Sequence, residues 1–330
     1  MLRLPAFEYL QPASIDEALR MKQNAGPRSQ YVAGGTDLYP NMKRRHEEPK
    51  TVIALGGIDE LGQISLESDA PFLGAGLTLT EVATQPRLRT SHSAVAGAAE
   101  LVSTPLLRNM GTLGGNLCLD TRCNYYNQSY EWRKSIDFCM KKDGTVCWVA
   151  PSSPRCWAVS SSDVAPVMVA LDAQYTLVGA DGERQVPAAG FYHDDGIEFL
   201  TKRPEEILVG VKLPAPNGWD AMYLKLRRRG AFDFPVLGVA VYLEWNESEV
   251  QDARIVLGGV ASYPKPMTDA SQLIVGSTLD DDVIAAAAHA AFKPTKPMDN
   301  TDFGLAWRKE MTRVYVKRAL TELRTRHRDA

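Results

Sequence analysis

The sequence predicts an α+β protein in which a larger N-terminal part precedes a smaller C-terminal domain. Its 330 residues are long enough for two or three domains, each with its own core. Short apolar runs of strand length alternate with helical segments as far as about residue 211. Two prolines, an asparagine and a glycine at residues 214–218 then favour a linker, because these residues interrupt regular structure. Beyond this linker the strand patterns come first and the helices follow.

Composition excludes several classes of function. Hydrophobic content of 45% and charged content of 23% are ordinary for a globular protein, and a net charge of −3 gives no reason to expect a nucleic-acid surface. No stretch approaches the roughly 18–20 apolar residues that span a bilayer. The N-terminus reaches Glu8 too soon to contain the apolar region of a signal peptide. We therefore expect a cytoplasmic protein that binds neither nucleic acid nor membrane.

Local signals predict each element of the N-terminal part. Ser14 and Glu17 match a capping box, which predicts a helix that stops near Gly26. Residues 80–83 open another helix, and an alanine-rich helix occupies about residues 94–102. A hairpin turn is expected at residues 180–183 and an apolar segment of undecided type at residues 164–171. Apolar runs predict strands at residues 31–33, 51–55, 173–178 and 207–211, and a strand followed by a turn at residues 71–77.

The C-terminal part is predicted to contain strands at residues 236–242 and 253–257. Helices are expected at residues 280–292 and about 303–323. The second helix has large side chains near helical spacing, at Trp307, Met311, Val314, Tyr315, Arg318 and Leu323.

Two glycine-rich turns are candidate phosphate-binding loops. Residues 34–37 follow a predicted strand, and residues 111–116 follow a predicted helix. Glycines allow positive φ and remove side chains that would hold a phosphate away, so successive N–H groups can point at one anion. Thr36, Thr112 and Asn116 add donor side chains. Neither turn fits the Rossmann or P-loop pattern, so a diphosphate site and a pair of simple tight turns both remain open.

Four of the five cysteines lie in one segment between the second glycine turn and Ser162-Asp163. They are separated by fifteen, seven and eight residues, at Cys123, Cys139, Cys147 and Cys156. The segment is predicted to be a loop set into a scaffold that would be continuous without it. A cysteine-rich loop beside a glycine-rich turn suggests a metal centre next to a phosphate-bearing cofactor, which is typical of electron transfer.

The residues alone leave three interpretations of these cysteines open. A [4Fe–4S] cluster takes four thiolates and tolerates varied spacing. A structural zinc site usually brings close C-x₂₋₄-C pairs, and none occurs here. Unrelated buried cysteines are the third interpretation, since disulfides conflict with the expected compartment and with an odd cysteine count. Cys118 is expected to be a small packed residue.

No residue is predicted to be catalytic. The five histidines are scattered without metal-ligand spacing, and no Gly-x-Ser-x-Gly nucleophile motif is present. Hydrolytic chemistry therefore has no support.

The chain resembles the FAD-binding subunits of the molybdenum hydroxylase (xanthine dehydrogenase) family over nearly its whole length. Five motifs occur in the family's order, at residues 32–38, residues 108–116, Ser162-Asp163, Lys225-x-Arg227 with residues 232–235, and residues 257–261. The resemblance implies a PCMH-type FAD-binding domain of two α/β subdomains and a C-terminal domain of a small antiparallel sheet with helices. The implied ranges are residues 1–57, residues 58–216 with an iron–sulfur insert at about 122–158, and residues 217–330.

The resemblance also implies which residues contact FAD. Both glycine turns would hold the diphosphate, and three later residues would complete the flavin site. The implied residues are Val32, Ala33, Gly34, Gly35, Thr36, Asp37, Leu38, Gly111, Thr112, Leu113, Gly114, Gly115, Asn116, Asp163, Leu208 and Lys225. Without the resemblance, Asp163 is expected to be a helix N-cap and Lys225 an exposed charge at a strand end.

The cysteine insert departs from most members of the family, which pass from Gly-Gly-Asn almost directly to Ser-Asp. It is similar to the loop of the 4-hydroxybenzoyl-CoA reductase branch, in which the cysteines hold a [4Fe–4S] cluster. The resemblance therefore implies cluster ligation by Cys123, Cys139, Cys147 and Cys156.

That branch implies an electron-transfer subunit with no substrate chemistry of its own. Its implied partners are a molybdenum-cofactor subunit and a [2Fe–2S] subunit in a dimer of heterotrimers, with ferredoxin as electron donor. The implied reaction is reductive dehydroxylation of 4-hydroxybenzoyl-CoA to benzoyl-CoA in anaerobic aromatic degradation. The alternatives are the flavin subunit of an oxidising molybdenum hydroxylase and a zinc-stabilised FAD-binding module.

Overall fold

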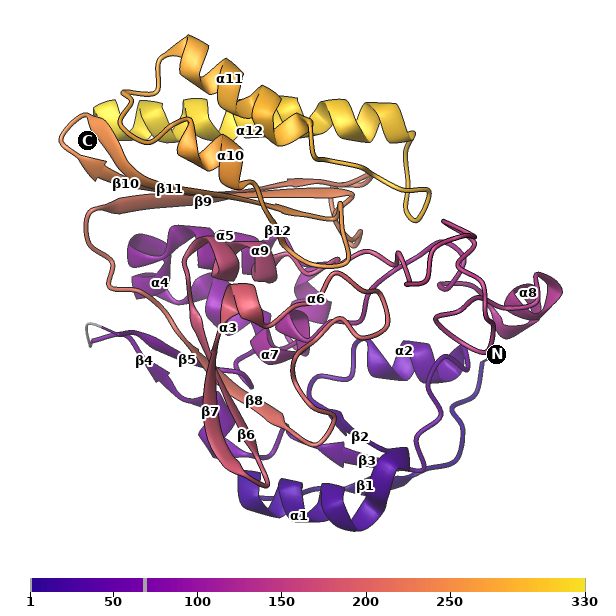
Figure 1. Cartoon of the computed structure of the whole chain (residues 1–330). Coiled ribbons are helices and arrows are strands. Elements are labelled where there is room, and N and C mark those ends of the chain that lie inside the picture. The colour runs from indigo at the N-terminus through magenta and orange to yellow at the C-terminus, as the bar shows by residue number, and fades with distance from the viewer. Residues whose placement is uncertain (1, 68–69, 330) are drawn as a thin grey trace.

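Three β-sheets and the helices between and over them make up the computed structural model, which describes residues 2–67 and 70–329 (Figure 1). The smallest sheet lies at the N-terminal end, and the sheet of the C-terminal part lies at the opposite end of the molecule. Helices and sheets are mixed along the chain, which confirms the α+β class predicted from the sequence. None of the described helices is long and apolar enough to cross a membrane.

The N-terminal sheet is parallel, with strand order β1-β3-β2. Parallel strands need crossover connections, and helix α1 (Ile15–Ala25) supplies the one from β1 to β2, which lie on either side of β3. The Ser14 hydroxyl accepts a hydrogen bond from the Glu17 amide at 3.2 Å, which confirms the predicted helix start. The first glycine turn follows β2 and leads into helix α2 (Leu38–Lys43). The strands are β1 (Glu8–Leu10), β2 (Ser29–Val32) and β3 (Thr51–Ala54).

The second sheet has five antiparallel strands in the order β4-β5-β8-β6-β7. Strand β8 (Ile207–Lys212) lies at its centre, and β6 and β7 form the predicted hairpin. The pairing of β6 with β8 shifts register between Thr176 and Leu177, where β8 has an extra residue, Val209. The remaining strands are β4 (Ile64–Ser65), β5 (Phe72–Gly74), β6 (Gln174–Gly179) and β7 (Gly182–Pro187). Short 3₁₀ helices occupy Gly26–Arg28, Asp59–Gly62 and Ala188–Gly190.

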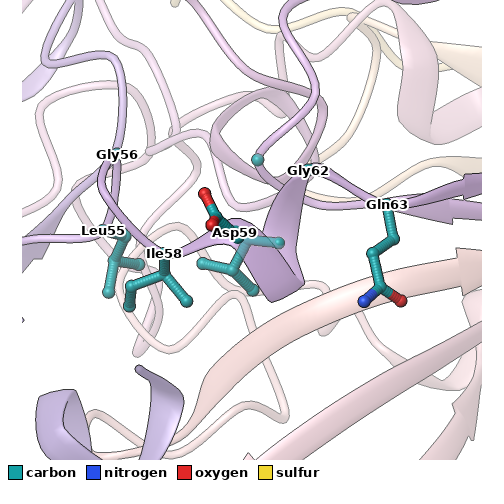
Figure 2. A pocket seen from close by; sticks show the side chains of 8 residues that line it. Leu55, Gly56, Ile58, Asp59, Gly62 and Gln63 are labelled. Atoms are coloured by element: carbon teal, nitrogen blue, oxygen red, sulfur yellow. The ribbon is translucent and has the colours of Figure 1, made fainter. Parts of the chain in front are cut away.

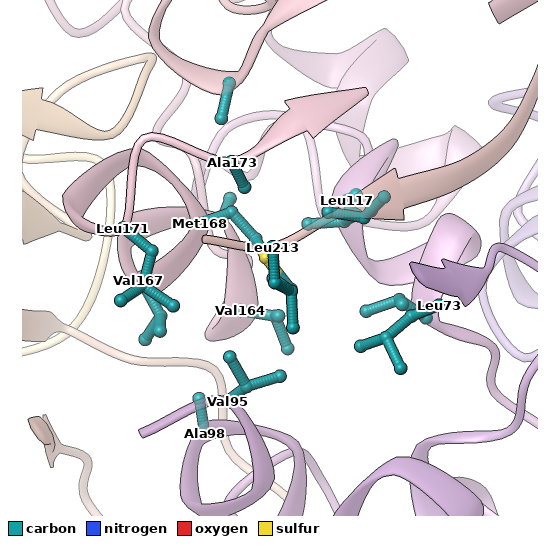
Figure 3. Packing of buried hydrophobic residues seen from close by; sticks show 14 of the residues in the cluster. Leu73, Val95, Ala98, Leu117, Val164, Val167, Met168, Leu171, Ala173 and Leu213 are labelled. Carbon is teal, nitrogen blue, oxygen red and sulfur yellow. The ribbon is translucent and has the colours of Figure 1, made fainter. Parts of the chain in front are cut away.

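A layer of short helices separates this sheet from the C-terminal sheet (Figure 1). Every residue of α9 (Val164–Ala170) is buried, because the helix packs against α5 on one side and strands β10 and β11 on another. Figure 3 shows Val95 of α5 beside Val164 of α9. Burial all round explains why the sequence of α9 has no polar face. The other helices of the layer are α3 (Leu79–Thr84), α4 (Pro86–Ser91), α5 (Ser93–Glu100), α6 (Pro105–Arg108) and α7 (Leu113–Leu117).

The C-terminal sheet is antiparallel and is covered on both faces. Alternate residues of β10 belong to different cores: Ala240 packs against the helical layer, whereas Val239 and Val241 pack against α11 and α12. This explains the continuous apolar run that predicted the strand. The strands are β9 (Trp219–Leu226), β10 (Leu237–Asn246), β11 (Glu249–Gly258) and β12 (Lys265–Pro266). The covering helices are α10 (Thr268–Gln272), α11 (Asp281–Phe292) and α12 (Leu305–Asp329).

The cysteine insert leaves the scaffold and returns to it at one point. Arg122 and Val159 exchange two backbone hydrogen bonds, of 2.8 and 2.7 Å, and so close the neck of the loop. Within the insert the chain is mostly turns, with a short helix α8 (Tyr130–Ser135) at its outer edge (Figure 1). The insert lies beside α2 of the N-terminal subdomain.

Packing of α12 on the C-terminal sheet predicts a large effect of truncating its buried face. Replacing the fully buried Leu320 by Ala should lower the free energy of unfolding by about 2–5 kcal/mol, because it leaves a cavity. Leu305 lies on the same helix but is 44% exposed, so it serves as the matched control. Leu305→Ala should change the free energy of unfolding by less than about 0.5 kcal/mol. Urea denaturation followed by tryptophan fluorescence measures both. Equal effects of the two substitutions would contradict this packing.

Candidate functional site

The two glycine turns, remote in sequence, lie directly against each other. A Cβ on Gly34 would overlap the carbonyl oxygen of Met110 and lie 3.0 Å from the amide nitrogen of Gly111. Gly35 has φ +69°, and a Cβ there would overlap the ring of Tyr39. The structure therefore brings residues 32–38 and 111–116 together, and glycine at position 34 is what permits the close approach.

The second turn is held by the loop that follows β5. The amides of Leu113 and Gly114 donate to the carbonyl oxygens of Leu77 and Ala75, both at 2.8 Å. The Thr112 hydroxyl accepts from the Gly115 amide at 3.0 Å and begins α7. Part of this predicted turn is thus a single turn of helix. The amides of Leu113, Gly114 and Gly115 are therefore already hydrogen-bonded within the protein.

Asn116 connects this turn to the start of α9. Its side-chain oxygen accepts from the Ser162 hydroxyl at 2.7 Å and from the Val164 amide at 3.3 Å. The Ser162 hydroxyl in turn accepts from the Ala165 amide at 3.0 Å. Ser162 is therefore the side chain that caps α9, and Asp163 makes no capping hydrogen bond.

The Asp163 carboxylate instead forms a buried ion pair with Lys225. The Lys225 ammonium lies 2.8 Å from one carboxylate oxygen, and the Tyr223 hydroxyl donates to the other at 2.9 Å. The same ammonium donates to the Leu101 carbonyl oxygen at 3.0 Å. Burial raises the pKa of Asp163 and lowers the pKa of Lys225. The charge of each residue opposes the shift in the pKa of the other. Asp163 does occupy the N-cap position of α9, as expected, but its carboxylate makes no capping hydrogen bond there. The expectation of an exposed charge for Lys225 is wrong.

Leu208 lies on the central strand β8 and is buried in the main core. The carbonyl oxygen of its neighbour Val209 accepts from the Ala75 amide at 2.8 Å. Strand β8 therefore runs beside the loop that holds the second glycine turn.

A cavity of about 320 Å³ is lined by the segment that follows β3 and by Gly76, and its lining includes no residue of either glycine turn (Figure 2). The Leu55 amide on its wall donates to the Val32 carbonyl oxygen at 2.8 Å, and Gly76 adjoins Ala75 of the loop described above. The only sequence signal for this wall is the predicted strand at residues 51–55, which two glycines follow at residues 56–57. The lining residues are Leu55, Gly56, Ile58, Asp59, Leu61, Gly62, Gln63 and Gly76.

The four insert cysteines are buried and line one small cavity. Apolar and aromatic side chains complete its wall, with Lys141 as the one ammonium in the lining. Burial raises the pKa of Cys123 to about 12 and that of Cys156 to about 11, and the Lys141 charge opposes the shift at Cys156. The other lining residues are Tyr125, Tyr126, Met140, Trp148, Val149 and Ala158.

Cys118 does not line this cavity: it ends α7 and packs against the main core, as predicted. Within residues 2–67 and 70–329, no three His, Cys, Asp or Glu side chains are grouped so that they could hold a metal ion.

The insert contacts the first glycine turn through Arg122. Its guanidinium forms an ion pair with Asp37 and lies 3.4 Å from the side-chain oxygen of Asn41 on α2. The ring of Phe234 lies 4.9 Å away on another side. The sequence did not single out Arg122, because a lone arginine in a loop has no periodic or motif signal.

Comparison with known proteins identifies the family. The family described as "FAD binding domain in molybdopterin dehydrogenase" matches residues 5–216, and "CO dehydrogenase flavoprotein C-terminal domain" matches residues 221–323. The aldehyde oxidoreductase FAD-binding subunit PaoB of Escherichia coli is 31% identical, with 88% of this chain and 93% of the relative covered. The carbon monoxide dehydrogenase medium chain of Hydrogenophaga pseudoflava is 27% identical, with 96% of each covered.

Solved structures give the same result. A chain of the Cu,Mo-CO dehydrogenase crystal structure superimposes with a TM-score of 0.81 at 25% identity, covering 98% of this chain and 99% of that one. Its likeness extends over both the FAD-binding part and the C-terminal sheet with its helices. The chain therefore belongs to the family of FAD-binding subunits of molybdenum hydroxylases that includes the CO dehydrogenase medium chains.

Proposed function

We propose that this chain is the electron-relay subunit of a molybdenum-containing 4-hydroxybenzoyl-CoA reductase, with a [4Fe–4S] cluster in its insert. The observation that carries the proposal is the convergence of Cys123, Cys139, Cys147 and Cys156 on one buried cavity. This cavity belongs to a loop that contacts the first glycine turn through Arg122. The proposed flavin site and the proposed cluster site would therefore adjoin each other through the Arg122–Asp37 contact.

The residues around the glycine turns fit FAD. Residues 32–38 and 111–116 would hold the diphosphate, because their backbones meet at Gly34 and leave no side chain between them. Asp163, Leu208 and Lys225 would complete the flavin site. We propose the domain ranges 1–57, 58–216 and 217–330 on the same basis, with the cluster in the insert at about 122–158.

We prefer a cluster to a single zinc ion because of the cysteine spacing. Structural zinc sites usually bring close C-x₂₋₄-C pairs, whereas the four insert cysteines are separated by fifteen, seven and eight residues. A [4Fe–4S] cluster takes one thiolate on each of four irons, so the sulfurs remain further apart. The aromatic and apolar lining would exclude water from the cluster.

Both groups would serve electron transfer: bound FAD exchanges electrons singly or in pairs, and a [4Fe–4S] cluster exchanges them singly. The residues of this chain would hold and shield them. Trp148 lines the cysteine cavity and is 38% exposed, so its side chain would shield part of the cluster from solvent. We propose a ferredoxin as donor, and a molybdenum-cofactor subunit and a [2Fe–2S] subunit as partners in a cytoplasmic dimer of heterotrimers.

A second candidate is the flavin subunit of an oxidising molybdenum hydroxylase. The names of the relatives favour it, since they include carbon monoxide dehydrogenase and a nicotine 6-hydroxylase of Paenarthrobacter nicotinovorans, 25% identical over 97% of this chain. In that case electrons would leave FAD outward, and the insert would be a zinc-stabilised or metal-free surface.

Cysteine substitution tests the cluster. Cys139→Ser should remove most of the iron and sulfide from anaerobically purified protein while the FAD absorbance remains, because Cys139 lines the cavity and is remote in sequence from both turns. Cys118→Ser is the matched control and should retain both, since Cys118 lies outside the cavity. Zinc at one per chain, without iron, would contradict the proposed cluster. Loss of FAD together with iron would mean that the insert is structural for the whole domain.

Removing one partner of the buried Asp163–Lys225 ion pair should destabilise the folded protein. Lys225→Met leaves the Asp163 carboxylate buried without its ammonium and should lower the free energy of unfolding by about 3–5 kcal/mol. Adding Asp163→Asn should restore part of this loss, because an amide oxygen still accepts from Tyr223 without a charge. Urea denaturation of the FAD-free protein measures both variants. Wild-type stability of the single variant would show that the pair is unimportant.

The choice of electron donor distinguishes the two candidate functions. The purified complex should reduce 4-hydroxybenzoyl-CoA with reduced ferredoxin or a reduced viologen. It should show no comparable turnover with NADH. Substrate oxidation with NAD as acceptor, and no reduction of the thioester, would favour the oxidising hydroxylase instead.

A further inference from the structure

We propose that Arg122 is a positioning residue through which the cysteine insert holds the first glycine turn ready for the FAD diphosphate. The inference rests on the FAD site proposed above and concerns a residue outside both glycine motifs. It makes the insert a structural part of the flavin site as well as a candidate redox centre.

The position of Arg122 fixes its side chain from several directions. It stands at the neck of the insert, where both its backbone groups pair with Val159. Its side chain is 6% exposed and reaches across to Asp37 and Asn41. The Phe234 ring lies 4.9 Å from the guanidinium carbon, so the C-terminal part also contacts it. A side chain enclosed by three segments has little freedom to leave Asp37.

Asp37 is the residue that needs this partner. It is an acid within a turn whose backbone N–H groups would face a diphosphate, and like charges repel at such short range. Its side chain is 33% exposed, so solvent does not neutralise it fully. One carboxylate oxygen pairs with Arg122, and the other accepts from the Asn41 amide at 3.1 Å. Arg122 therefore neutralises the acid and directs it toward the insert.

A matched arginine elsewhere in the chain provides the control. Arg254 makes the same kinds of contact: an ion pair of 2.8 Å with Asp252, a hydrogen bond of 2.9 Å to the Ala170 carbonyl oxygen, and a ring contact of 4.2 Å with Tyr242. It lies on β11 and contacts none of the predicted FAD residues. Loss of an equivalent set of contacts at Arg254 should leave FAD affinity unchanged.

The test is FAD titration of the full-length FAD-free chain, followed by flavin fluorescence. Arg122→Met should weaken FAD binding about tenfold, and Arg122→Lys, which retains the charge, should weaken it less. Arg254→Met should bind like wild type. In the Asp37→Asn background the carboxylate is gone, so adding Arg122→Met should cost less than about threefold. Thermal unfolding of each FAD-free variant separates affinity from folding, and Arg122→Lys carries the test if Arg122→Met does not fold.

The outcomes separate two failures. If wild type binds FAD and Arg122→Met binds it equally well, the inference is overturned while the flavin site stands. An equal loss from Arg122→Met with and without Asp37→Asn also overturns it, because Arg122 would then not act through Asp37. If wild type itself binds no FAD, the proposed function fails and the inference fails with it.

Discussion

The buried Asp163–Lys225 pair is the interaction on which the arrangement of the site depends. Asp163 begins α9, Lys225 belongs to β9, and the ammonium also binds the last carbonyl of α5 at Leu101. Through Ser162 and Asn116 the same junction reaches the second glycine turn. Two charges removed from water are tolerated only with such complete pairing. The pair therefore fixes the positions of the helical layer, the C-terminal sheet and the second glycine turn relative to one another.

Much of the fold follows from local sequence signals, and the exceptions have physical reasons. The Ser14 capping box, the apolar run of β10 and the helix begun by Asp280 depend on neighbouring residues, so the sequence predicts them. Strand β9 is not predicted from the sequence, because Asp220 and Lys225 limit its continuous apolar run to residues 221–224. The burial of Lys225 depends on Asp163, which is 62 residues away and leaves no local pattern.

In the candidate site, too, local sequence signals predict some features, and others depend on residues that are distant in the sequence. The glycine motifs and the resemblance named the residues of both turns, but no pattern indicated that Gly34 would meet Met110. The cysteine spacings did not require a common cavity either: the fold of the insert produces it. Part of that fold comes from Arg133, which is fully buried and donates to the carbonyl oxygens of Arg44 and Arg45 beyond α2. Single arginines that bind backbone carbonyls leave no trace in composition or periodicity.

The closed neck at Arg122 and Val159 bears on how such an insert can be acquired. A longer loop with paired ends adds little to the loop-closure part of the conformational cost, which rises by only about 0.6 kcal/mol for each doubling of length. The host sheets and helices need not move to accommodate it. An ancestral flavin subunit could therefore gain or lose the whole segment in one step. Selection would then act on whether the added segment folds around the group that it binds.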